Sequence, residues 1–202
     1  MNFFQVSSSD STVPTRKRPR KFCREKVISL RARTITTGLA MGYFWEYSPL
    51  RAEQFVREKY KWQGRKDKVA AVGAIIDPGL CLNLLDAKGL SYLEVGYDAL
   101  LTARGGEEFL PKNGEGKELW KRKLDCAVIN MVHELRAVTQ TTDWQEENPD
   151  TAPLQSYDTV RGAFWEGGPI YPGARIEKKN HVQICVRNSA SIIGYFRPIP
   201  DS

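Results

Sequence analysis

Few side chains in this sequence are suited to metal or nucleophilic chemistry. The chain has two histidines, His133 and His181, and four cysteines that form no C-x-x-C pair. Two histidines are too few for a multi-histidine metal site, and cysteines this far apart favour neither a zinc ribbon nor a disulfide framework. We therefore expect no metal cofactor, and we expect mostly buried, reduced thiols at Cys23, Cys81, Cys126 and Cys185.

The polar residues of greatest interest lie in the segment 181–187. Its apolar residues Val182, Ile184 and Val186 alternate with polar ones, which is typical of a strand with two different faces. The pattern predicts that His181 and Gln183 share a face, either as ligand contacts or as edge-strand residues that face water. His133 lies in a strongly periodic helical segment, off its apolar face, and is expected to be a surface or packing residue. Neither G-x-G-x-x-G nor a P-loop motif occurs.

Periodicity predicts the elements that would position these residues. Helices are expected over 49–60, over 86–103 with Asp86 as the cap, and over 117–139. Strands are expected over 69–76, 157–165, 181–187 and 192–196, whereas residues 141–155, with two prolines, predict a loop. Early helices and late hairpin-like strands favour an α+β fold with a mixed or antiparallel sheet.

Charge divides the chain of 202 residues into two unequal regions. The net charge is +6, and residues 1–33 carry nine basic side chains against Asp10 and Glu25. We expect this segment to be disordered, as either a solvated tail or a nonspecific nucleic-acid contact, and residues 34–202 to form one domain. The sequence shows neither an apolar run of about 20 residues nor a secretory signal, so a cytoplasmic protein without a membrane partner is expected.

Three segments resemble ADP-ribosyltransferases of the His–Tyr–Glu class, which includes the poly(ADP-ribose) polymerases and bacterial toxins. Gly42–Glu46 is similar to the second motif of that class, Tyr157–Gly162 to the strand before the third motif, and Asn180–Cys185 with Ile193–Phe196 to the third motif and closing strand. Leu124–Asn130 and Asn180–Asn188 also resemble a bacterial group associated with this superfamily. The resemblance implies split mixed or antiparallel β-sheets with flanking helices, and NAD⁺ bound between them.

The resemblance also implies roles for particular residues. Tyr43 would stack on nicotinamide, while His181 and Gln183 would contact ribose where the family has a glutamate. Phe44 and Phe55 would also contact the cofactor, and Arg161 would bind a phosphate. Phe55 directly follows Gln54, which occupies the position where many relatives carry an aromatic residue. Glu46 and Glu166 are candidates for proton transfer to or from the acceptor molecule.

One family feature is missing, because no histidine precedes His133 to serve as the first motif. Residues 33–42 are interpreted, as a hypothesis, as translated in a shifted frame. The expected function is NAD⁺-dependent mono-ADP-ribosylation of a protein or nucleic acid by a toxin or phage-defence effector, with an antitoxin as a further partner. Two alternatives remain open: a catalytically impaired nucleotide- or partner-binding domain of the same fold, and a nucleic-acid-binding protein that acts through residues 1–33.

Overall fold

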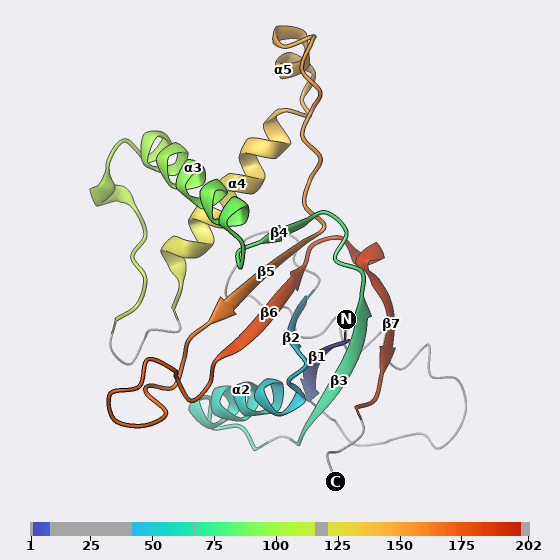
Figure 1. The fold of residues 1–202 in the computed structure, drawn as a ribbon, viewed down its shortest axis with the longest axis vertical. Helices are drawn as coiled ribbons and strands as arrows, with labels where there is room; N and C mark the ends of the chain where they lie inside the picture. The colour runs from blue at the N-terminus through green and yellow to red at the C-terminus, as the bar shows by residue number, and fades with distance from the viewer. Residues whose placement is uncertain (1, 9–41, 67, 116–120, 199–202) are drawn as a thin grey trace.

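A computed structural model describes residues 2–8, 42–66, 68–115 and 121–198 of the chain. The strands form one seven-stranded sheet in the order β4-β5-β6-β2-β1-β3-β7 (Figure 1). They are β1 (Asn2–Ser8), β2 (Gly42–Glu46), β3 (Val69–Ile76), β4 (Cys81–Asn83), β5 (Thr159–Phe164), β6 (His181–Val186) and β7 (Ile192–Phe196). The helices are α2 (Pro49–Trp62), α3 (Ala87–Arg104), α4 (Lys123–Val138) and α5 (Thr142–Glu147), with short 3-10 turns η1 (Glu107–Phe109) and η3 (Ser189–Ser191).

The sheet is mixed and has two halves. β4 and β5 are parallel, and every other pair is antiparallel. β1 joins the four strands β4-β5-β6-β2 to the pair β3-β7. Phe44, Ile184 and Val186 of the four-stranded half pack against Ala74 and Ile76 of β3. The sheet therefore bends so that one face of each half meets in a common core, and the predicted α+β class is confirmed.

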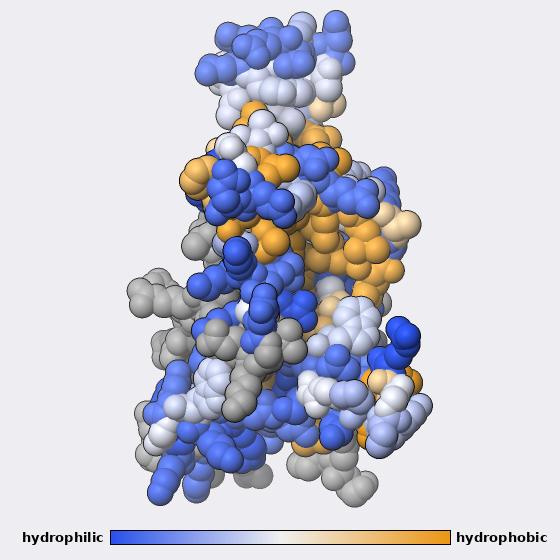
Figure 2. Space-filling model, turned by 90° about the vertical axis from the view of Figure 1, so that its left-hand side faces the viewer, coloured by the Kyte–Doolittle hydropathy of each residue, from blue (hydrophilic) through white to orange (hydrophobic). Residues whose placement is uncertain are grey.

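Helices cover the other face of the sheet. α2 packs its buried residues against Trp45 of β2 and against Val69 and Ala71 of β3. α4 places Val132 against Leu82 and Val160 of β4 and β5. α3 lies along α4, and the close approach of the two helices occurs at Gly96, next to Val132. Figure 2 shows the resulting distribution: apolar side chains gather in a band between the hydrophilic end at α5 and a hydrophilic lower region.

Local signals account for several element ends. The Asp86 side chain accepts a hydrogen bond from the Gly89 amide at 2.6 Å, which confirms the predicted cap of α3. Gly105 ends that helix with φ of 80°, in the left-handed region that glycine adopts without steric cost.

In the part of the chain that the structure describes, no helix is long and apolar enough to cross a membrane.

Several predictions of local structure were wrong. Residues 2–8 form β1 in the interior of the sheet although the first residues were expected to be disordered, because pairing with β2 and β3 satisfies their backbone. Residues 142–147 form α5 within the expected loop, where Thr141 caps the helix by accepting from the Trp144 amide. β4 was not predicted, since three residues carry too little periodicity, and α4 begins only at Lys123.

Candidate functional site

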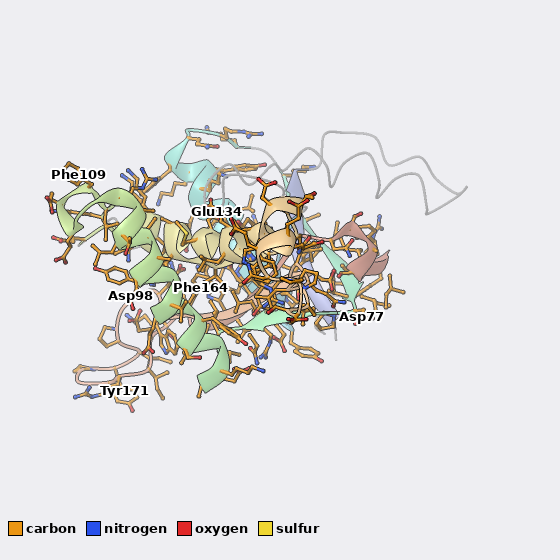
Figure 3. The ribbon with its side chains drawn as sticks, turned by 90° about the horizontal axis from the view of Figure 1, so that it is seen from above. Asp77, Asp98, Phe109, Glu134, Phe164 and Tyr171 are labelled. Carbon is orange, nitrogen blue, oxygen red and sulfur yellow. The ribbon has the colours of Figure 1, made fainter. Side chains whose placement is uncertain are left out.

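Register brings the central candidates onto one face of the sheet. Tyr43 lies opposite Cys185 and Trp45 opposite Gln183, while Phe164 lies opposite His181. Because side chains alternate along a strand, all of these residues project from the face that α2 and α4 partly cover. Figure 3 shows Phe164 near the middle of the molecule, whereas Phe109 and Tyr171 lie at its periphery.

His181 is buried in a central strand. β6 lies between β5 and β2, and only 9% of His181 is exposed. Its ring stacks on that of Phe164 with 5.5 Å between centroids and 11° between planes. Burial, together with the Arg51 charge, lowers the pKa of His181 below its ordinary value, despite opposing contributions from the Lys179 carbonyl and Glu166. The reading of His181 as an edge-strand residue that faces water is therefore wrong.

The hydrogen bonds of His181 determine the orientation of Gln183. His181 Nδ1 lies 2.7 Å from the carbonyl oxygen of Lys179, which can only accept, so this nitrogen carries the proton. In the neutral ring Nε2 is then an acceptor, and Gln183 Nε2, at 2.8 Å, donates to it. This arrangement leaves the carbonyl oxygen of Gln183 as the group able to accept a hydrogen bond from a ligand.

A partly buried ion pair adjoins this face. Arg51 of α2, 5% exposed, donates from Nη2 to Oε2 of Glu166 at 2.5 Å. Phe55, one helical turn after Arg51, lies 5.1 Å from the Trp45 ring and 6.0 Å from the Arg51 guanidinium carbon. We call these four residues, Trp45, Arg51, Phe55 and Glu166, the Arg51–Glu166 cluster. The cluster adjoins His181 through Trp45, because the ring centroids of Trp45 and His181 are 6.3 Å apart.

Three donors of this cluster have no acceptor. Within the described residues, Arg51 Nε, Arg51 Nη1 and Trp45 Nε1 are buried and make no hydrogen bond. A buried donor without an acceptor costs about 1–3 kcal/mol. Such groups mark a place where water or a ligand atom would stabilise the fold.

Two of the predicted cofactor contacts lie on the opposite face. Phe44 is fully buried in the core between the sheet halves. Arg161 faces the same way and binds Glu46 with two hydrogen bonds of 2.8 and 3.2 Å. The structure thus gathers Tyr43, Phe55, His181 and Gln183 on one side of the sheet and separates them from Phe44 and Arg161.

His133 belongs to a different region. It lies in α4, is 9% exposed, and meets the edge of Tyr157 with 5.9 Å between ring centroids. Burial, aided by the charges of Arg187 and Arg136, lowers the pKa of His133 to about 4. The expectation that it lies off the buried face of its helix was wrong, because Tyr157 packs over that side of α4.

Arg51 was not identified from the sequence. It stands directly before Ala52 and one turn before Phe55, and only this closeness to the apolar positions of α2 hinted at burial. Its partner Glu166 is 115 residues away, so no local pattern could reveal the pair. Trp45 was foreseeable, because it shares the alternation of Tyr43.

The thiols show no activated nucleophile among the described residues. Cys81, Cys126 and Cys185 are unbridged. Burial raises the pKa of Cys185 to about 11 and that of Cys126 to about 12, so both stay protonated at neutral pH. Among the residues that the structure describes, no group of three or more histidine, cysteine or acidic side chains could hold a metal ion.

All nine basic side chains of the segment 1–33, and residues 33–41 of the shifted-frame hypothesis, lie outside the described residues. Comparison with protein-family models, with curated proteins and with solved structures found no match in any of the three.

Proposed function

We propose that the protein is a NAD⁺-dependent mono-ADP-ribosyltransferase that modifies a macromolecule. One observation carries this proposal: Tyr43, His181 and Gln183, each implied by the resemblance, project from one face of the neighbouring strands β2 and β6. On that face Trp45 packs against α2, and Cys185 packs against the core cluster to which α4 contributes Val132.

The chemistry requires a group that loosens the bond between ribose and nicotinamide. When that bond breaks, its electron pair leaves with nicotinamide, and the ribose carbon acquires positive charge until a nucleophile of the acceptor attacks it and loses a proton. Tyr43 would stack on the nicotinamide ring. Gln183, held by His181, would accept a hydrogen bond from a ribose hydroxyl through its carbonyl oxygen.

This arrangement favours a single transfer over chain elongation. His181 is neutral, and both of its ring nitrogens are engaged inside the protein. The strand therefore contributes dipoles and no negative charge, in contrast to the glutamate of the family. A toxin or phage-defence effector restrained by an antitoxin would need only one modification per target.

The same observation supports a second candidate function. A face that offers an aromatic ring and an amide acceptor without a carboxylate on the strand could bind a nucleotide without cleaving it. In that case the protein is a nucleotide- or partner-binding module of the same fold. The two functions differ in turnover, which can be measured directly.

The test uses the full chain and NAD⁺ labelled in the nicotinamide moiety, with and without cell lysate as a source of acceptors. We expect nicotinamide release by the wild type, and a loss of at least tenfold in Tyr43→Ala and Gln183→Leu. Tyr171→Ala is the matched control, because Tyr171 is 61% exposed and lies in the loop after β5. Circular dichroism would show that each variant is folded. A thermal shift with NAD⁺ but no release would support the binding module and contradict the transferase.

A further inference from the structure

Helix α4 is apolar on two sides. Towards the sheet it packs Ile129 and Val132 in the cluster that contains residues of β4 and β5. A second row of apolar residues recurs at spacings of three and four, which places its members on one side of the helix: Leu124, Ala127, Met131 and Leu135. Met131 lies about 200° round the helix from Ile129, so this row faces away from the sheet. A helix in the outer layer of a domain usually presents polar residues on that side.

Helix α3 contributes a matching row. Leu90, Tyr97 and Leu101 recur at spacings of seven and four, so they share one side of α3. Tyr97 and Leu101 belong to the same hydrophobic cluster as three residues of the α4 row, and we call the two rows together the α3–α4 face. The face is open to solvent, because Leu90 is 49% exposed and Leu135 37%. Figure 2 shows apolar side chains at the surface at the level of these helices, below α5.

The α4 row is complementary to itself when a second copy of the helix runs in the opposite direction. If Ala127 of one copy lies opposite Met131 of the other, a two-fold axis relates the copies and the converse contact forms as well. A small side chain then meets a large one at both points. In the same register Leu124 and Leu135 come level to within one residue, which is an axial rise of about 1.5 Å.

Charge supports the same register. Lys123 and Glu134 are exposed, and neither makes an ion pair within the described residues. They are eleven residues apart, close to three helical turns, so both lie on one flank of the α4 row. The antiparallel register brings Lys123 of each copy level with Glu134 of the other to within one residue, and a two-fold axis keeps matching flanks together. Parallel helices would instead place Lys123 beside Lys123.

The α3 row agrees with this register. Gly96 marks the close approach of α3 to α4, where it lies beside Val128 and Val132. A two-fold axis that crosses α4 midway between Ala127 and Met131 therefore crosses α3 near residue 96. Leu90 and Leu101 lie about equally far on either side of that point, as a two-fold axis requires. Two rows that come from different helices thus share one centre of symmetry.

We propose that the chain forms a symmetric dimer in which the α3–α4 faces of two copies pack against each other. Four helices then bury apolar rows that a single copy leaves open to water, and this burial supplies most of the affinity. The reciprocal Lys123–Glu134 pairs set the direction of the helices more than they add affinity. The α3–α4 face lies on the side of α4 away from the sheet, so the dimer does not rest on the proposed reaction with NAD⁺.

The mass of the full chain in solution tests the dimer. Sedimentation equilibrium over a range of concentrations should give the mass of two chains. Lys123→Glu and Glu134→Lys each place like charges opposite one another at two points, so each should weaken the dimer by roughly tenfold. The double variant Lys123→Glu/Glu134→Lys should restore it. Both changes suit the helix dipole of α4, so neither should unfold the helix.

The apolar contact is tested by Leu135→Lys, which introduces a charge into the centre of the packed face. We expect this variant to be monomeric at concentrations where the wild type is dimeric, with an unchanged circular dichroism spectrum. Ile193→Lys is the matched control, because Ile193 is 68% exposed in β7, away from both helices. Lys88→Glu is the control for charge, since Lys88 lies about 200° round α3 from Leu90. Both controls should remain dimeric.

Each outcome either supports the dimer or overturns it. A wild type that is monomeric at every concentration would overturn it and leave the α3–α4 face to a different protein. A dimer that Leu135→Lys does not weaken would show that another surface joins the copies. A dimer that Leu135→Lys dissociates but that the double charge variant fails to restore would overturn the antiparallel register. Restoration by the double variant, after weakening by each single one, would support it.

Discussion

At the scale of single residues, both histidines are buried and neutral, but only one of them adjoins the candidate site. His181 stacks on Phe164 and orients Gln183. His133 lies against Tyr157, and its Nε2 is buried without a partner among the described residues. Only His181 is therefore placed to sense a ligand on the sheet face, whereas His133 affects stability alone.

His133 makes stability fall in acid. Its folded-state pKa is about 4, below the ordinary value of about 6.5. Between these pH values the unfolded chain binds a proton that the folded chain does not, so the free energy of unfolding decreases as pH falls from 6.5 to 4. The shift corresponds to a loss on the order of 3 kcal/mol at most. His181, whose pKa is also lowered, acts in the same direction.

His133→Phe tests this linkage. The variant keeps a ring against Tyr157 and has no group to protonate, so we expect its stability to change less between pH 7 and pH 5 than that of the wild type. Urea unfolding followed by circular dichroism measures both slopes. Equal slopes in the two proteins would contradict the linkage at His133.

The sequence predicted which residues share a face of a strand wherever apolar and polar residues alternate. The pattern along 181–187 placed His181 and Gln183 on one face, and the strand register agrees. The same alternation would have separated Arg161 from them had the register between β5 and β6 been known. Register depends on pairing across distant segments, and this is why Arg51 and Glu166 were not found as a pair.

At the scale of elements, helix α3 depends on a close approach to the strand before it. The Gly89 backbone lies so near β4 that a Cβ atom there would be 1.8 Å from the carbonyl oxygen of Asn83. The same glycine donates its amide to the Asp86 cap. A glycine in the first turn of a helix therefore has a packing role here that outweighs its poor helix propensity.

Gly89→Ala should destabilise the protein although alanine is the better helix former. The added methyl group meets backbone atoms that cannot move cheaply, and overpacking of this kind costs about 1–3 kcal/mol, against a propensity gain of about 1 kcal/mol. Gly194→Ala in β7 is the control, because nothing lies within 4 Å of its added Cβ. Urea unfolding compares the two variants, and a Gly89→Ala variant as stable as the control would show that the helix and strand do not approach so closely.

Elements with strong periodicity or a cap could be predicted, and elements that depend on distant partners could not. α3 was foreseen from Asp86 and its apolar residues, and β7 from its β-branched run. β1 has a polar second half, and its pairing with β3 extends from Asn2 opposite Ile75 to Ser8 opposite Val69. Only that tertiary pairing shows that residues 2–8 form a strand.

At the scale of the whole molecule, β1 joins the two halves of the sheet. All seven of its residues pair with β3, whose other neighbour β7 pairs only from Gly73 to Ile76. The strand β2, which carries Tyr43, borders β1 on its other side. The candidate site is therefore built on a half-sheet that β1 connects to the rest of the core.

Deletion of residues 1–8 should expose the first half of β3. Hydrogen exchange followed by mass spectrometry should show faster exchange at residues 69–72, which lose their ladder partner, because unpaired backbone amides open at low free-energy cost. The amides of β6 provide the internal control, since they are paired with β2 and β5. Unchanged protection of β3 would contradict the position of β1 in the sheet.

The most direct test of the central claim is an NMR titration of the full chain with NAD⁺. With only two histidines in the chain, the ring Hε1 region contains two assignable signals, and His133→Phe identifies each of them. If NAD⁺ binds at the face of Tyr43 and Gln183, the His181 signal shifts as NAD⁺ is added while the His133 signal stays in place. A stationary His181 signal at saturating NAD⁺, or equal shifts of both signals, would contradict the assignment.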